Sequence, residues 1–220
     1  MPHPRARRSI CCAITMLACA SNLDADTLNV PGDYSSIEDA ISASTDGDTI
    51  LVAPGTYQEG PLNLAGKSLT LTSRDGPEVT TITCPSGVEA TVLLIRGASN
   101  QNEVELSGFT ISNGVAENGL GGGVRIIGDA SQEFSMPIIV TVRDCVFLNN
   151  TASTEGGGLY ASSETNVSLL DCVFRSNSTA GRGGGAALNC ISSSQVRRCR
   201  FEGNIAAENA GGLKIGNDFN

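Results

Sequence analysis

Apolar and polar residues alternate in short runs along most of the chain, which is the pattern of half-buried β-strands. Val140 and Val142 alternate in one such run. The same spacing recurs at Ile50 and Val52, Leu69 and Leu71, and Val167 and Leu169. No segment after residue 45 carries a sustained helical stripe. The pattern therefore predicts an all-β protein built from many short strands.

Two landmarks repeat every 27 residues. The run Asp144–Phe147 returns at 171–174 and, in altered form, at 198–201. The glycine triplet 156–158 returns at 183–185 and, with one alanine, at 210–212. A looser copy lies upstream, at Gly108–Ile111 and 121–123, and its triplet is eight residues farther from the next one. These extra residues predict a loop at Asp129–Pro137, since solenoids accept insertions at turns.

A fixed period in which two landmarks keep one register predicts a solenoid, with each unit forming one coil. Equivalent residues then lie about 4.8 Å apart, the spacing of neighbouring strands in a parallel sheet. Phe147, Phe174 and Phe201 should form an internal stack. The step from Val142 to Phe147 is odd, so both can face inward only if the chain bends between them, at Asp144 and Cys145.

Turn residues predict the other corners. Asn150, Asn177 and Asn204 follow the repeated phenylalanines, and asparagine tolerates left-handed backbone, so we expect a corner there. The glycine triplets predict a second corner. Upstream, Ser35 and Glu38 resemble a capping box, with Ile37, Ala40 and Ile41 as an apolar stripe. We therefore expect a helix at residues 35–43 that covers the first coil, whose sheet edges would otherwise be open.

The first 25 residues have the features of an export signal. Three arginines precede an eleven-residue apolar stretch from Ile10 to Ala20, and small residues offer cleavage after Ala20 or Ala25. Eleven residues are too few for a membrane span, which needs about 20. A lipoprotein signal at Cys19 fits less well, because Met16, Leu17 and Ala18 are poor residues ahead of a lipidated cysteine. We thus expect residues 1–25 to be removed, residues 26–220 to form one β-helix domain, and the protein to be extracellular or on the cell surface, with no other transmembrane segment.

Charge and histidine content narrow the function. Removal of residues 1–25 takes away three arginines and one aspartate, so the net charge changes from −9 to −11. This field disfavours nucleic acid as a partner, and it would repel an anionic polysaccharide unless a divalent cation bridged the two. The one histidine, His3, lies in the predicted signal. The mature chain therefore has no histidine base, no Ser-His-Asp triad and no histidine metal ligand.

Five cysteines remain after cleavage, and three of them share the 27-residue register. The five are Cys84, Cys145, Cys172, Cys190 and Cys199. An odd number in an exported protein leaves at least one thiol free or paired outside the chain. In-register side chains point the same way and suit a disulfide poorly, so we expect a buried thiol ladder. One bridge between a pair and a metal or catalytic role are the alternatives.

Two N-terminal segments and the repeat units resemble known protein families. Residues 30–37 (VPGDYSSI) and 46–57 (DGDTILVAPGTY) resemble the first segment of the pectin-lyase-like superfamily. The Phe-x-x-Asn and Gly-Gly units are similar to repeats of polymorphic outer-membrane proteins. The resemblance covers nearly all of residues 26–220 and implies a single-stranded, right-handed parallel β-helix. It does not imply an activity, because the superfamily includes lyases, hydrolases, epimerases, tailspikes and surface proteins. The catalytic patterns of its polygalacturonases and pectate lyases are absent from this sequence.

One column carries candidate chemistry. The register stacks Asp144, Asp171 and Arg198 on adjacent coils, where two carboxylates could hold calcium and Arg198 could act as a catalytic base or substrate clamp. The alternative is that all three are bend residues, with Arg198 relieving the repulsion between the acids. With Arg197 and Arg200, Arg198 could also form an anion-binding strip, although a solvated face is the simpler interpretation.

These observations favour a non-catalytic module without a bound cofactor that contacts a polysaccharide or cell-surface glycan, or serves adhesion. A polysaccharide lyase that uses Asp144, Asp171, Arg198 and calcium is the alternative. Leu213 begins a further strand after the last triplet. Either that edge is exposed in the native protein or the chain is part of a longer open reading frame.

Overall fold

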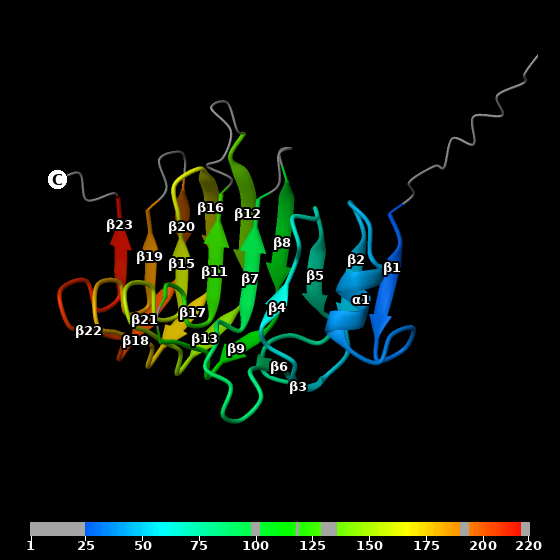
Figure 1. Ribbon diagram of the computed structural model, residues 1–220, viewed down its shortest axis with the longest axis horizontal. Coiled ribbons are helices and arrows are strands. Elements are labelled where there is room, and N and C mark those ends of the chain that lie inside the picture. The colour runs from blue at the N-terminus through cyan, green and yellow to red at the C-terminus, as the bar shows by residue number, and fades with distance from the viewer. Residues whose placement is uncertain (1–24, 98–101, 118, 129–135, 190–193, 217–220) are drawn as a thin grey trace, which may run out of the picture.

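The protein winds as a right-handed parallel β-helix in the computed structural model, which describes residues 25–97, 102–117, 119–128, 136–189 and 194–216. In Figure 1 the strands in front run upward, the strands behind run downward, and the chain advances from right to left. Each coil is therefore right-handed. The predicted fold class is therefore confirmed. Residues 1–24 of the predicted signal, Cys190, and residues 129–135 of the predicted loop lie outside the described ranges.

Two long sheets, A and B, form adjacent walls of the helix, and all their strand pairs are parallel. Sheet A contains β1 (Thr27–Val30), β2 (Thr49–Val52), β5 (Thr70–Ser73), β8 (Glu103–Ser107), β12 (Ile138–Arg143), β16 (Thr165–Leu170) and β20 (Gln195–Arg197). Sheet B contains β3 (Gly55–Gln58), β6 (Thr80–Thr83), β9 (Thr110–Ser112), β13 (Val146–Leu148), β17 (Val173–Arg175) and β21 (Arg200–Glu202).

Sheets D and C complete each later coil before the chain returns to sheet A. Sheet D contains only two-residue strands: β10 (Val115–Ala116), β14 (Thr151–Ala152), β18 (Ser178–Thr179) and β22 (Ile205–Ala206). Sheet C contains β4 (Leu62–Asn63), β7 (Leu93–Arg96), β11 (Val124–Ile127), β15 (Leu159–Ala161), β19 (Ala186–Leu188) and β23 (Leu213–Ile215). The strand predicted from Leu213 onward is thus present as β23.

The 27-residue register is the stacking register of the coils. In sheet B, Phe147 pairs with Phe174 and Phe174 with Phe201. Their rings stack with centroids 4.5 and 4.9 Å apart and nearly parallel planes. Phe147 and Phe174 are fully buried. The predicted internal stack is therefore confirmed, and it fills the core where this sequence has few other aromatic residues.

The insertion lies where the sequence predicted it. Val124 of β11 pairs with Leu159, 35 residues later, whereas Ile138 of β12 pairs with Thr165, 27 residues later. The eight extra residues therefore fall between β11 and β12, on the turn from sheet C to sheet A. An insertion there leaves every inward-facing position in register.

The bend between sheets A and B also agrees with the sequence. Val142 and Phe147 both face the core, and Asp144 between them adopts a left-handed backbone with φ of 52°. Asp171 and Arg198 repeat this conformation at φ 55° and 52°. A single left-handed residue reverses the alternation of side chains, so both flanking strands bury their apolar faces.

The corner after sheet B differs from the prediction. The left-handed residues are Asn149, Ser176 and Gly203, one position before the asparagines that were expected to turn the chain. Asn150 and Asn177 are instead fully buried, and their amides are hydrogen-bonded from coil to coil. Asn150 Nδ2 donates to Asn177 Oδ1 at 3.0 Å, and Asn177 Nδ2 donates to Asn204 Oδ1 at 3.0 Å. The asparagines therefore satisfy buried backbone at the corner, while the preceding residue makes the turn.

The glycine triplets form the second corner, as expected. Gly156 and Gly183 have φ of 67° and 68°, a backbone that glycine adopts without strain. A Cβ added to Gly157 would collide with the carbonyl oxygens of Ser178 and Gly184 in the next coil. Glycine is needed here because backbone packs directly on backbone.

Helix α1 (Ile37–Ala43) lies against β1, β2 and β4 at the N-terminal end of the solenoid. Ile37, Ala40 and Ile41 are buried, as the apolar stripe predicted. The predicted cap is one residue off, because Ser36 is the N-cap and accepts a hydrogen bond from Asp39 N at 3.0 Å.

Two later side chains hold the ends of α1. Glu59 accepts a hydrogen bond from Glu38 N at 3.0 Å. Lys67 Nζ donates to the carbonyl oxygens of Ile41 and Ser44, at 2.5 and 2.8 Å. An acid at the helix N-terminus and a base at its C-terminus complement the helix dipole. The helix is thus fixed to the second coil at both ends.

Candidate functional site

The structure brings Asp144, Asp171 and Arg198 together as one column along the edge between sheets A and B. Each is the left-handed residue that joins a strand of sheet A to the next strand of sheet B. Their side chains point to solvent, because the following residue of each bend turns inward. The column ends at Asp144, since Gly108 occupies the same bend one coil earlier.

Within the column, Arg198 takes both oxygens of Asp171. Arg198 Nε lies 2.6 Å from Asp171 Oδ1, and its terminal nitrogen lies 2.6 Å from Oδ2. The guanidinium holds the pKa of the Asp171 carboxyl below its ordinary value, and the carboxylate raises the pKa of Arg198. Calcium could reach both oxygens of Asp171 only if Arg198 moved away. Calcium binding and a catalytic Arg198 therefore stay predictions.

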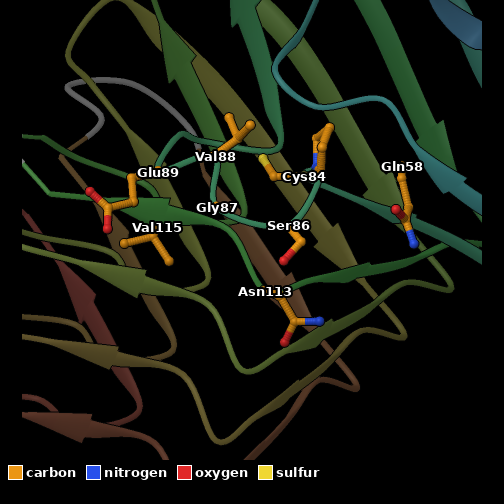
Figure 2. A pocket seen from close by; sticks show the side chains of 9 residues that line it. Gln58, Cys84, Ser86, Gly87, Val88, Glu89, Asn113 and Val115 are labelled. Carbon is orange, nitrogen blue, oxygen red and sulfur yellow. The ribbon is translucent and has the colours of Figure 1, made fainter.

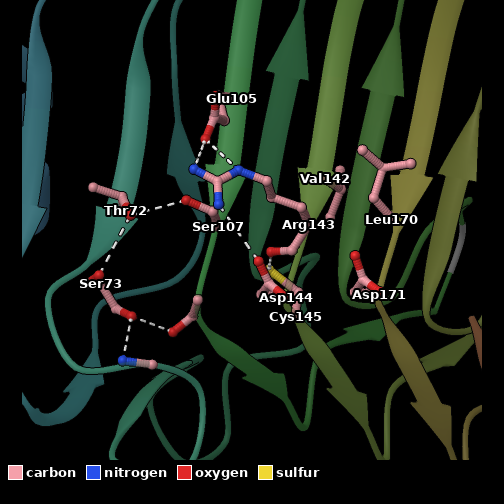
Figure 3. Close-up of polar contacts among 12 residues, drawn as sticks. Thr72, Ser73, Glu105, Ser107, Val142, Arg143, Asp144, Cys145, Leu170 and Asp171 are labelled. Carbon is pink, nitrogen blue, oxygen red and sulfur yellow. Dashed lines mark hydrogen bonds and ion pairs between the residues drawn. The ribbon is translucent and has the colours of Figure 1, made fainter. Parts of the chain in front are cut away.

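Asp144 belongs to a second charge group, shown in Figure 3. Arg143 extends from β12 and donates from Nε to Glu105 Oε1 at 2.7 Å. Its terminal nitrogen Nη1 lies 3.4 Å from Asp144 Oδ2. Arg143 is therefore shared by Glu105 and Asp144. The hydrogen bond with Glu105 raises the pKa of Arg143. Both predicted calcium ligands thus have an arginine partner of their own.

Hydroxyl groups continue the edge toward the N-terminus (Figure 3). Ser107 Oγ donates to Thr72 Oγ1 at 2.8 Å, and Ser73 Oγ donates to the carbonyl oxygen of Gly108. Ser73 Oγ also accepts from Gly76 N at 3.1 Å. These hydrogen bonds close the turn beside the bend at Gly108. The hydroxyl groups of Ser73 and Ser107 therefore have structural partners.

The thiol column lies just inside this edge. Cys145 and Cys172 are buried and Cys199 is partly buried, and all three are free thiols. Each sulfur contacts the carbonyl oxygen of the residue two positions before it, at 3.2 to 3.4 Å. Burial raises the pKa of Cys145 to about 12, which makes it a poor nucleophile. The predicted thiol ladder is present in these coils, and the sulfurs help to close the bend.

A hollow that the sequence did not predict lies beside sheet B, with a volume of about 440 Å³. Its polar side chains come from three coils: Gln58 from β3, Ser86 and Glu89 from the turn after β6, and Asn113 after β9. Figure 2 shows Ser86 facing Asn113, with Gln58 and Glu89 on opposite sides. No repeat links these positions, and only the turn residues Pro85, Ser86 and Gly87 mark the segment in the sequence.

A second hollow, of about 500 Å³, continues from the first over sheet D, and Val115 lines both. Thr151 and Ser178 border it on adjacent coils, with their hydroxyl oxygens 3.0 Å apart. Glu117 lines this hollow, and its hydrogen bond and charge raise the pKa of Glu89 in the first. We call the two hollows together the side groove. It offers amide, hydroxyl and carboxyl groups and follows the helix axis.

Comparisons with known proteins identify a repeat in the later coils. Residues 144–162 match the Chlamydia polymorphic membrane protein repeat. No curated protein matches the chain. Among solved structures, a pectin methylesterase from Aspergillus niger matches at 18% identity with a TM-score of 0.43, over 87% of this chain and 81% of that one. Among the described residues, no helix is long and apolar enough to cross a bilayer. The chain is thus a parallel β-helix that carries a repeat similar to those of polymorphic membrane proteins.

Proposed function

We propose that this protein is an exported, surface-located β-helix that contacts a glycan through the side groove and has no catalytic role. The observation that carries the proposal is the chemistry of the groove. Gln58 and Asn113 supply amides that can both donate and accept, and Ser86, Thr151 and Ser178 supply hydroxyls. Such groups match the hydroxyl groups of a sugar chain.

The spacing of these groups favours an extended ligand. Residues on successive coils of a parallel sheet repeat at about 4.8 Å, so a polymer that lies along the groove passes one coil after another and can meet polar groups from several of them. Thr151 and Ser178 are one such pair. The matched repeat, named for membrane proteins, supports a location at the cell surface.

Charge favours a neutral glycan over an anionic one. The mature chain would carry a net charge of −11, and Glu89 and Glu117 lie at the groove itself. A uronate polymer would meet repulsion there, whereas uncharged sugars would not.

The test is affinity electrophoresis or a glycan array with the mature protein. We expect retention by at least one neutral polysaccharide, weakened about tenfold by Gln58→Ala, which removes an amide at the groove. Gln195→Ala is the matched control, because Gln195 is an exposed glutamine on β20 of sheet A. Equal binding by both variants would refute the groove as the contact site, and absence of binding to every glycan would refute the function.

A further inference from the structure

A largely shielded triad of Glu155, Asn189 and Lys214 lies on the outer face of sheet C. Lys214 belongs to β23, Asn189 follows β19 directly, and Glu155 lies between β14 and β15. The three residues thus come from three successive coils at the C-terminal end of sheet C, where β15, β19 and β23 lie side by side (Figure 1).

The contacts within the triad are mutual. Lys214 Nζ lies 2.9 Å from Glu155 Oε1 and 2.9 Å from Asn189 Oδ1. Asn189 Nδ2 donates to Glu155 Oε2 at 2.7 Å. One carboxylate therefore holds both the amine of the lysine and the amide nitrogen of the asparagine, and the amine lies against the amide carbonyl.

This group is withdrawn from water. The side chains of Lys214 and Glu155 are only 11% and 14% exposed. Lys214 extends past Ala187, its strand partner in β19, to reach Glu155 two coils away. Ala187 is fully buried, and its small side chain leaves the space that the lysine occupies.

The repeat keeps no residue type at any of the three positions. Positions 27 residues away hold Arg182 instead of Glu155, Ser162 instead of Asn189, and Ala187 instead of Lys214. The column of Glu155 continues through Arg182 to Asn209, and the column of Lys214 holds Arg125, Tyr160 and Ala187 on the earlier coils, so stacking requires no particular residue at either position. Burial of an ion pair is weak evidence for stability, because loss of hydration offsets much of the attraction. Stacking therefore does not explain why these three side chains meet at one point, and their contacts point to another role.

We propose that Lys214 and Asn189 become joined by an isopeptide bond, with Glu155 as the proton carrier. A proton passes from the Lys214 ammonium to Glu155, and the neutral amine attacks Cγ of Asn189. Glu155 gives that proton to Nδ2, the Cγ–Nδ2 bond breaks, and ammonia leaves. Glu155 takes the second proton from Nζ and passes it to the departing ammonia, which is released as ammonium.

The reaction needs no reactant other than these three side chains. One C–N bond forms and one C–N bond breaks, no electrons are transferred, and Glu155 returns to its carboxylate form. The fold supplies what the reaction needs, because it holds amine, amide and acid–base group in contact in a site shielded from water. The product would link the coil of β19 to that of β23 covalently.

The test is the intact mass of the mature protein purified after folding. We expect the chain to be lighter than its sequence by one ammonia, and a tryptic digest to contain peptide 183–197 joined to peptide 201–220 with no cleavage after Lys214. A wild-type chain of unchanged mass would overturn the proposal.

Two variants separate this bond from ring closure at an asparagine, which also releases ammonia. Lys214→Arg and Glu155→Gln should both restore the full mass, whereas Lys67→Arg should keep the loss, because Lys67 contacts only residues at the end of α1. A loss that persists in Lys214→Arg would assign the ammonia to ring closure at an asparagine, Asn189 included, and refute the isopeptide bond.

Discussion

Arg198 and Asp171 lie on adjacent coils, and both guanidinium–carboxylate distances between them are 2.6 Å. An aspartate at position 198 would repel Asp171 at this end of the column, whereas Arg198 attracts it. Both side chains are substantially exposed, at 68% and 38%. Exposed pairs of this kind contribute little to stability, so their effect should be visible mainly through pH.

The pH dependence follows from the lowered pKa of Asp171. A carboxyl whose pKa is lower in the folded state than in the unfolded state stabilises the fold above the unfolded value, and this contribution is lost as pH falls through the folded value. The ordinary value is 3.8. We therefore expect the melting temperature of the wild type to fall more steeply below about pH 4 than that of Asp171→Asn. Glu103→Gln, at an exposed carboxylate of β8, is the control, and parallel curves for wild type and Asp171→Asn would contradict the assignment.

Calcium binding can be tested against the same pair. Because Arg198 covers both oxygens of Asp171, we expect calcium to bind Arg198→Ala more tightly than the wild type in calorimetric titration, and Asp171→Ala to remove that gain. Tighter binding to the wild type than to Arg198→Ala would show that Arg198 does not compete. Unsaturated product absorbance on uronate polymers with calcium, lost in Arg198→Ala, would establish the lyase alternative instead.

The asparagine ladder should dominate the stability of the corner after sheet B. Asn177 is fully buried, and its Oδ1 accepts from both the backbone N and Nδ2 of Asn150. Asn177→Ala would leave Asn150 N without this acceptor and would leave Asn150 Nδ2 with the carbonyl oxygen of Ile111 alone. Because each buried group left so costs about 1–3 kcal/mol, we expect a loss of about 3 kcal/mol in urea unfolding. Ser178→Ala, at the partly exposed neighbouring residue, should change stability by less than about 0.5 kcal/mol, and a similar small effect for Asn177→Ala would disprove the role of the ladder.

The sequence predicted those parts of the fold in which the 27-residue period and the residue type indicate a single conformation. The odd step from Val142 to Phe147 located the bend at Asp144, and the 27-residue register located the phenylalanine stack. Asn150 was misread because asparagine signals both a left-handed backbone and an amide that pairs with backbone. Only the structure shows that Asn149 turns and Asn150 bonds.

The sites outside the register could not be found in this way. Gln58 and Asn113 meet in the side groove only because the intervening coil brings them there. Glu155, Asn189 and Lys214 are separated by 34 and 25 residues, and neither spacing equals the period. Residues that break a repeat are visible in the sequence, but which of them meet depends on how far their side chains reach across coils.

The glycine corner gives a further test of backbone packing. A Cβ at Gly157 would lie 2.5 Å from Gly184 O, and neither backbone can move without disturbing the stack. We expect Gly157→Ala to cost at least about 3 kcal/mol in urea unfolding, at or above the usual range for overpacking. Gly119→Ala is the control, because its nearest neighbour would be the Cβ of Ala116 at 3.8 Å. Equal stability of the two variants would mean that the triplets are not packed backbone to backbone.

Residues 27 apart lie on top of one another in the later coils, and the separation of spin labels on successive coils measures this stacking. Thr151 and Ser178 are strand partners on the exposed face of sheet D. Cysteines at both positions, labelled and frozen, should give strong dipolar broadening, whereas labels at Thr151 and Gln195 on different sheets should give much less. Wild-type protein treated in the same way corrects for the native thiols. Equal spectra from the two pairs would contradict the stacked coils.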